Sequence, residues 1–355
     1  PQVVHLISAY ALGVVVGAPV LAIIGARFFR RQLLIWLMAF YAVGNLASAL
    51  AEGYTGVMIA RFVAGLPHGA YFGIASLVAA SLVPPHQRAK AVARVMMGLT
   101  LALLLGNPLA AWLGQSLDWR YVYAFVGLIA VVTLTMVISV LPTDPDEQRQ
   151  GSFSEIRSFN KPGIWFALAI GAIGFSGMFA VLSYLAPTLL EVTEVAPFWI
   201  PIGLAVFGLG GFIGNLLGGW LFDRLGFRAV GVILLLSAGI LLAFPSTTGS
   251  LPALLAACFL VAMMGALGPA LQTHLMDVAH GAQTLAAASH HAAFNMANAL
   301  GPWLAGIAIT AGYGWSSTGY VGATTAAIGL VIFLAAWRYN EKGLRNAEAY
   351  QASVY

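Results

Sequence analysis

Charge is what this sequence has least of. Only 8% of its 355 residues are Asp, Glu, Lys or Arg, whereas 60% are hydrophobic. A soluble domain carries about 25% charged residues, so this chain cannot cover a water-facing surface, and most of it must face lipid or other buried segments. Only α-helices and closed barrels satisfy their backbone hydrogen bonds in lipid. The apolar runs extend over about 20 residues, twice what a barrel strand needs, and therefore predict an all-α, polytopic membrane protein.

Other absences limit the function. The single cysteine, Cys258, excludes an internal disulfide. We find no P-loop, dinucleotide glycine motif, catalytic triad pattern or metal-ligand spacing. The adjacent His290 and His291 would point about 100° apart on a helix and make a poor metal pair. We therefore expect neither an enzyme nor a nucleic-acid-binding protein, and no cofactor or metal.

Apolar length and the polar residues between the runs predict eleven spans. These cover residues 5–25, 33–51, 55–82, 91–115, 121–141, 162–187, 199–222, 229–246, 251–278, 284–311 and 316–337. Of the sixteen Lys and Arg residues, Arg61 and Arg94 lie within spans, Arg120 lies in a loop on one side, and all the others lie on the opposite side. The positive-inside rule makes that opposite side the cytoplasm, so we expect a cytoplasmic C-terminus and an external residue 1.

Segments of the first part of the chain recur in the second part at a nearly constant spacing. The cationic turn at 22–31 recurs 197 residues later at 219–228. Gly106, in a Leu-Gly-Asn-Pro sequence, recurs 195 residues later as Gly301 in Leu-Gly-Pro, and a Trp follows each of them. This spacing indicates two parallel halves.

The repeat also predicts the domain organisation. The second half begins near Pro162, so the first should begin roughly 34 residues before Pro1, which is room for one more helix. The expected parts are an N-terminal bundle at 1–142 with five spans and its first helix missing, a cytoplasmic inter-bundle loop at 143–161, a C-terminal bundle of six spans at 162–340, and a cytoplasmic tail at 341–355.

Four sequence phrases carry a family resemblance. They are Tyr10-Ala-Leu-Gly-Val-Val-Val-Gly-Ala-Pro19, Arg61-Phe-Val-Ala-Gly-Leu-Pro-His-Gly69, Gly106-Asn-Pro-Leu-Ala-Ala-Trp-Leu-Gly114 and Asp118-Trp119-Arg120. The chain resembles the major facilitator superfamily, and more closely the arabinose-efflux-permease-like bacterial exporters of its drug:proton antiporter branch. The phrases fall on helices two to six of a twelve-helix template.

The resemblance implies a major facilitator fold of two six-helix parallel-repeat bundles, eleven spans of which are present here. It implies proton-coupled efflux of small amphipathic solutes, drugs or sugars, by alternating access in the bacterial inner membrane. The expected partners are then the lipid bilayer, a small-molecule substrate and protons, and we expect a monomer. The alternative is a non-transporting membrane sensor or an inactive transporter fragment.

The turn at 219–228 resembles the family's cytoplasmic signature. Asp223 there would accept hydrogen bonds from a neighbouring helix N-terminus or pair with an arginine, which would latch two helices together. In the first half Ala26 stands at the position of that Asp, so anchoring by positive charge is the expected role of its arginines. The candidate latch residues are Arg27, Arg30, Arg31, Asp223, Arg224, Gly226 and Arg228. The competing interpretation is a charged turn that only sets topology.

Arg61 and His68 are the candidates for proton coupling. A charge within a span costs roughly 2.5–3.5 kcal/mol on insertion scales, so Arg61 is expected to face the bundle interior. The resemblance implies a coupling role for Arg61. Helical spacing puts Arg61, Gly65 and His68 on one face, and an imidazole takes up and releases protons near neutral pH. Snorkelling of Arg61 and a neutral packing role for His68 are the alternatives.

The helix around Gly98, Gly106, Pro108 and Gly114 resembles the antiporter signature of helix five. Glycines permit close helix contact and Pro108 bends the helix, so this segment is the expected gating element. The candidates for lining a substrate cavity are Tyr10, His68, Tyr71, Phe72, Asn107, Phe175, Phe179, Tyr184, His291 and Asn295. Core packing and interhelical hydrogen bonds are the alternatives for these residues.

No predicted span carries Asp or Glu near its middle. Proton antiport commonly uses a carboxylate inside the membrane. In the exporters that this chain resembles, an acidic residue is often found in helix one. Our hypothesis is that the main proton carrier belongs to the segment that would precede Pro1.

Overall fold

A computed structural model describes residues 2–25, 27–84, 88–142, 159–279 and 281–354. Eleven helical segments within these ranges are long and apolar enough to cross a membrane, which confirms the predicted number. They match the predicted spans closely, for example at Pro162–Ser183, and the all-α class is confirmed for the described residues.

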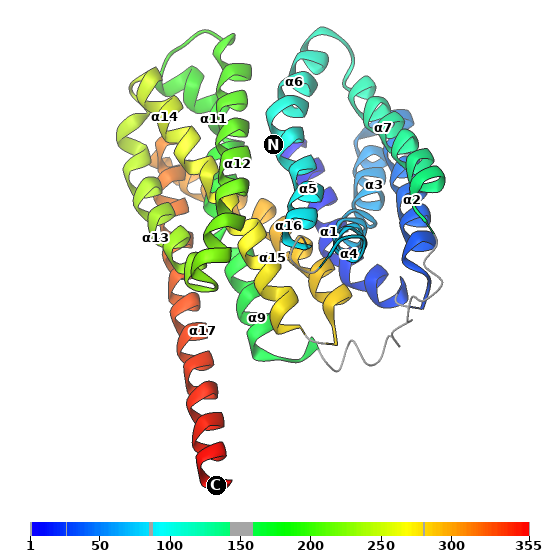
Figure 1. Cartoon of the computed structure of the whole chain (residues 1–355). Coiled ribbons are helices and arrows are strands. Elements are labelled where there is room, and N and C mark those ends of the chain that lie inside the picture. Colours follow the sequence, from blue (N-terminus) through cyan, green and yellow to red (C-terminus); the bar gives the residue numbers. More distant parts are fainter. Residues whose placement is uncertain (1, 26, 85–87, 143–158, 280, 355) are drawn as a thin grey trace.

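Two groups of helices lie side by side in Figure 1. The first contains α1 (Gln2–Gly25), α2 (Arg30–Leu50), α3 (Gly53–Gly65), α4 (His68–Ser81), α5 (Arg88–Leu101), η2 (Ala102–Gly106), α6 (Asn107–Ser116) and α7 (Trp119–Val140). The second contains α9 (Pro162–Ala169), η3 (Ile170–Gly174), α10 (Ser176–Ser183), α11 (Leu185–Pro187), η4 (Thr188–Val192), α12 (Trp199–Leu225), α13 (Arg228–Ala243), η5 (Phe244–Thr247), α14 (Leu251–Ala262), η6 (Met263–Ala266), α15 (Leu267–Val278), α16 (Gln283–Ala308), η7 (Ile309–Tyr313), η8 (Trp315–Ser317) and α17 (Thr318–Val354). The division at 143–161 stays a prediction, and 143–158 lies outside the described residues.

Basic turns gather at one end of the molecule. The turns between α1 and α2 and between α12 and α13 lie toward the end where α17 projects, and the turn between α6 and α7 lies at the opposite end (Figure 1). This arrangement matches the loop sides that the distribution of Lys and Arg predicts.

Several spans are interrupted near their middle, and proline accounts for three of the breaks. Proline lacks an N–H and clashes with the carbonyl four residues earlier. Pro67 separates α3 from α4, Pro108 follows the π-helical turn η2, and Pro269 follows the 3-10 turn η6. Such breaks leave backbone polar groups and side chains at mid-span free to serve a site.

Glycine contacts reproduce the sequence repeat in three dimensions. A Cβ at Gly13 would overlap the carbonyl oxygen of Phe62, and a Cβ at Gly210 would overlap that of Phe259. Both partners are shifted by the same 197 residues. The helices α1 and α3 therefore pack at the same close distance, and through equivalent residues, as α12 and α14.

The two groups of helices meet along two seams. α1 and α4 pack against α16, and α5, η2 and α6 pack against α12. In the first seam a Cβ at Gly73 would lie 2.7 Å from the backbone nitrogen of Ala288, so α4 touches α16 at backbone distance. The candidate site lies along these seams.

Candidate functional site

Arg61 is held inside the first group of helices. Its Nη1 donates a hydrogen bond to Asn45 Oδ1 at 3.1 Å, and Asn45 is only 1% exposed. The guanidinium carbon lies 4.3 Å from the ring centre of Tyr10 and 4.7 Å from that of Tyr123. These two cation–π contacts, with α1 and α7, compensate a charge placed within a span.

His68 is the first residue of α4 and is bonded to α1. Its Nδ1 and the Tyr10 hydroxyl form a hydrogen bond of 2.7 Å. The close packing of α1 on α3, at Gly13 and Gly65, brings Tyr10 within reach of both Arg61 and His68. The helix break after Gly65 does not separate Arg61 from His68, because both side chains meet the same tyrosine.

A series of rings leads from His68 to the second group of helices. The His68 ring centre lies 5.1 Å from that of Phe72, and Phe72 lies 5.2 Å from His291 on α16. The next ring, His290, lies 5.4 Å from His291. The structure thus brings together four predicted residues, Tyr10, His68, Phe72 and His291, across the seam between α4 and α16.

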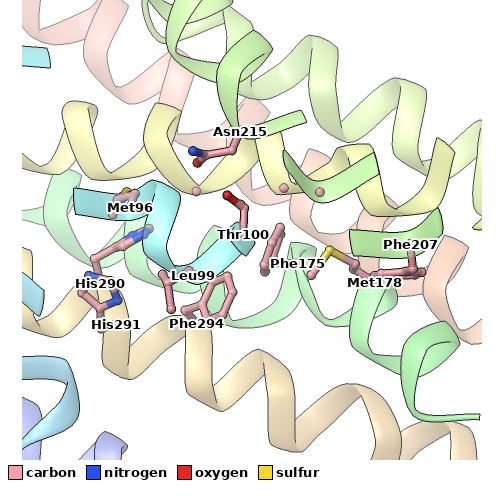
Figure 2. Close-up of a pocket in the computed structure, with 13 residues that line it drawn as sticks. Met96, Leu99, Thr100, Phe175, Met178, Phe207, Asn215, His290, His291 and Phe294 are labelled. Carbon is pink, nitrogen blue, oxygen red and sulfur yellow. The ribbon is translucent and has the colours of Figure 1, made fainter. Parts of the chain in front are cut away.

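A cavity of about 50 Å³ lies beside His291, between α5, α10, α12, α15 and α16 (Figure 2). It is lined by Met96, Leu99, Thr100, Phe175, Met178, Phe207, Gly211, Asn215, Gly265, Gly268, His290, His291 and Phe294. Its lining is mostly apolar, and its polar side chains carry amide, hydroxyl and imidazole groups. Asn215 and Thr100 were missed at the sequence level, although an Asn in a glycine-rich span is a detectable signal.

Other predicted cavity residues lie farther from this centre. Phe179 is buried against Phe294, with ring centres 5.1 Å apart, and does not line the cavity. Tyr184 donates a hydrogen bond to the Pro302 carbonyl at 3.1 Å. Asn295 donates to the carbonyl of His291 at 2.9 Å, within its own helix. These contacts are those of packing residues.

Two more of these candidates flank the site. Phe175 lines the cavity, with its ring centre 4.8 Å from that of Phe294. Tyr71 lies edge-on to Phe72 at 6.3 Å and packs among α2 side chains. The side chain of Asn107 lies outside the described part of the structure.

The predicted latch residues lie in the two basic turns. Gly226 ends α12 with a φ of +55°, a conformation that favours glycine. Arg224 stacks on Trp220, with its guanidinium carbon 4.2 Å from the ring centre, and Arg228 lies 5.1 Å from the Trp337 ring. Asp223 is exposed, and no described side chain is seen to pair with it.

In the first half, Arg31 joins two helices. Its Nε donates to the Leu141 carbonyl and its Nη2 to the Ile138 carbonyl, both at 2.7 Å. A cation at the C-terminal end of α7 also interacts favourably with the helix dipole. Arg27 is exposed and Arg30 half-buried in the same turn. The latch remains a prediction.

The predicted gating segment runs through α5, η2 and α6. Gly98 and Gly114 have no described heavy atom within 4 Å of an added Cβ, so they hold no close helix contact in this arrangement. Gly106 is the last residue of the π-helical turn η2, and Pro108 lies in the first turn of α6. The predicted bend therefore falls at the junction of η2 and α6. The gating role remains a prediction.

Comparison with known proteins decides the family. The sequence model of the Major Facilitator Superfamily matches residues 1–288 and 200–352. The chain belongs to the major facilitator superfamily. It is a multi-pass membrane protein of a transporter superfamily, and the resemblance in its helix motifs is confirmed.

Relatives of this major facilitator protein include transport and efflux proteins. It is 37% identical over 343 residues to the inner membrane transport protein YdhP of Escherichia coli strain K12, covering 96% of this chain and 88% of the relative. It is 30% identical over 341 residues to the chloramphenicol resistance protein of Streptomyces lividans, covering 93% of this chain and 84% of that protein. Among solved structures, that of the human organic anion transporter MFSD10 superposes with a TM-score of 0.74 at 18% identity, over 93% of this chain and 83% of the other, which shows the shared fold.

Proposed function

We propose that this protein is a proton-coupled exporter of small amphipathic solutes, with His68 as a proton site in the first group of helices. The observation that carries the proposal is the hydrogen bond between His68 and Tyr10 beside Arg61, inside the span and next to the seam with α16. A titratable ring at a seam between moving parts is where a proton changes the balance between two arrangements.

The chemistry of the bond gives a mechanism. In a neutral imidazole that carries its proton on Nε2, Nδ1 accepts a hydrogen bond from the Tyr10 hydroxyl. Proton uptake occurs at Nδ1, so the ring becomes a donor there and the tyrosine hydroxyl must turn to accept. The added charge also lies near Arg61, and like charges repel. Both effects loosen the contact between α1 and α4.

The groups around His68 determine what its protonation does to the packing of the helices. The groups that face it are Tyr10 of α1, Tyr41 of α2, Arg61 of α3, and His291 of α16 beyond Phe72. Because Phe72 contacts both imidazoles, a shift of His68 is passed to the second group of helices. Alternating access would use this connection.

The remaining expectations belong to the same proposal. We infer a monomer in the bacterial inner membrane, with the basic turns and the tail at the cytoplasmic face. The bend at Pro108 would gate, and Asp223 would latch in the opposite arrangement of the bundles. Chloramphenicol and sugars are the first solutes to test, because relatives are a chloramphenicol resistance protein and a probable sugar efflux transporter.

The test is uptake into proteoliposomes with an imposed pH gradient. Acid-loaded vesicles diluted into alkaline buffer should accumulate labelled chloramphenicol or arabinose. His68→Gln should abolish gradient-driven accumulation while exchange of labelled for unlabelled solute at equal pH continues. Native protein that drives no flux of either solute would overturn the transport proposal. Full accumulation by His68→Gln would overturn the role of His68.

A further inference from the structure

The cavity beside His291 borders the position that corresponds, in the second repeat, to His68 in the first. Gly13 on Phe62 and Gly210 on Phe259 are equivalent contacts 197 residues apart, as are Gly17 on Leu66 and Gly214 on Met263. In this register His68 corresponds to Gly265 and Tyr10 to Phe207. Gly265 has no side chain, and it lines the cavity together with Phe207.

Two polar groups at this cavity have no hydrogen-bond partner among the described residues. They are Nδ2 of Asn215 and Nε2 of His291, in residues only 5% and 2% exposed. A buried donor or acceptor without a partner is destabilising, so a ligand that satisfies it gains binding free energy. In Figure 2 Thr100 lies between Asn215 and Phe175, and its hydroxyl already donates to the Met97 carbonyl at 3.0 Å. That hydroxyl retains the capacity to accept.

The lining also determines which charge the ligand carries. The described side chains around the cavity include three phenyl rings and two methionines, and none of them is Asp, Glu, Lys or Arg. A charged group brought here would lose its hydration without gaining a counter-charge, which is strongly unfavourable. An uncharged solute with an apolar body and hydroxyl or amide groups meets both demands.

We propose that Asn215 and His291 bind an uncharged, hydrogen-bonding solute in the cavity between α5, α12, α15 and α16. Asn215 donates to a carbonyl or hydroxyl oxygen of the solute, and His291 bonds a second polar group. His291 also touches Phe72, which touches His68. A solute bound in the cavity therefore affects the position of His68 through these ring contacts. The proposal deepens and rests on the proposed transport function, because it names the class of solute.

In the described arrangement the cavity is smaller than the proposed solutes, so this arrangement corresponds to a contracted state of the site. Its volume of about 50 Å³ holds one or two waters, since a water occupies about 30 Å³, whereas sites for drug-sized ligands measure roughly 300–1,000 Å³. A solute therefore enters when α5 and α12 move apart, and bound water is the competing occupant.

The experiment is equilibrium binding to the purified protein in lipid nanodiscs, without any pH gradient. The probes are labelled chloramphenicol and arabinose, both uncharged, with tetraphenylphosphonium as a cationic competitor. An uncharged probe should bind, and the cation should not compete. Asn215→Leu should weaken binding about tenfold or more, and Asn215→Asp should make the cation compete.

Gln272→Leu is the matched control. Gln272 of α15 is fully buried and, like Asn215, has an unpartnered amide nitrogen among the described residues, but it does not line the cavity. It should bind within about twofold of native, and both leucine variants should melt at or above the native temperature, because each removes an unpaired amide.

Several outcomes would overturn the inference. The first is that neither uncharged probe binds, and the second is that the cation competes in the native protein. The third is native affinity in Asn215→Leu, which would mean that the probe binds elsewhere and that water is the only occupant of this cavity. Binding as expected without gradient-driven flux would contradict the proposed transport function but support the binding site. Gradient-driven flux together with unchanged affinity in Asn215→Leu would contradict the binding site but not the transport function.

Discussion

Two equivalent positions of the repeat differ in the charge and hydrogen bonding of their side chains. In the first copy Tyr10, Arg61 and His68 form a bonded, charged cluster inside the span. The equivalent residues of the second copy are Phe207, Cys258 and Gly265, an aromatic ring, a buried thiol and a glycine that lines the cavity. The glycine contacts that position both sets are the same. The scaffold is therefore repeated while its side chains differ, with a charged group in one copy and uncharged, smaller groups beside a cavity in the other.

His291 stands between the two places. Its ring contacts Phe72 of the first group and its edge reaches the cavity of the second. A proton-coupled exporter, as proposed above, needs its proton site and its solute site to influence each other, and this contact connects the two. We therefore propose that the first copy handles protons and the second recognises the solute.

Breaking the shared scaffold should have the largest effect. Gly13→Val and Gly210→Val each place a side chain on a backbone carbonyl, so each should destabilise the protein by about 3 kcal/mol. Thermal melting of the purified variants measures this. Gly239→Ala, where an added Cβ meets no described atom, should melt at the native temperature or slightly above it. Tolerance of valine at only one of the two positions would mean that the copies do not share their packing.

Removing charge from the first copy should come next. Arg61→Leu loses a charged hydrogen bond and two cation–π contacts and leaves Oδ1 of buried Asn45 without its described partner. Gradient-driven flux should fall about a hundredfold, since the lost interactions amount to roughly 3 kcal/mol. At the equivalent position, Cys258→Ala should retain flux within about twofold. Comparable losses in both variants would contradict the specialisation of the first copy.

A larger side chain at Gly265 tests the proposed solute site of the second copy. In Gly265→His an imidazole is restored at the place equivalent to His68, and its Cβ would lie 3.2 Å from the Gly211 carbonyl oxygen. Solute affinity should fall about tenfold because the side chain takes the ligand's space. Binding of labelled chloramphenicol measures the change, and unchanged affinity would place the solute elsewhere.

The smallest expected effect comes from one hydroxyl. Tyr10→Phe keeps the ring under Arg61 but removes the hydrogen bond to His68. A single hydrogen bond contributes about 0.5–1.5 kcal/mol, so gradient-driven flux should slow about threefold to tenfold. Affinity for the solute should stay the same at pH 8. A loss of affinity equal to the loss of flux would show that Tyr10 contacts the solute instead.

Sequence reasoning predicted the fold well because spans, charge bias and repeats depend on local composition. Eleven spans and the repeat spacing follow from apolar length and from turn motifs. Tyr10, His68, Phe72 and His291, which the structure brings together, were among the sequence candidates, since ionisable residues inside spans are rare; their roles stay predictions.

The cavity could not be predicted in the same way. Its lining comes from five helices and includes glycines such as Gly265 and Gly268, and a space beside residues without side chains becomes visible only once the helices are packed. Asn215 resembles any packing amide until its Nδ2 is found without a partner. Conversely, Phe179 and Tyr184 have helical spacing suited to a cavity, but their rings are used in packing.

Proton exchange during solute binding tests the division between the two copies most directly. Calorimetric titration of chloramphenicol in buffers of different ionisation enthalpy, near neutral pH, gives the number of protons exchanged per bound molecule. Native protein should exchange protons on binding, His68→Gln should bind within about threefold of native without proton exchange, and Asn215→Leu should bind about tenfold more weakly. Native proton exchange in His68→Gln, together with native affinity in Asn215→Leu, would contradict this division.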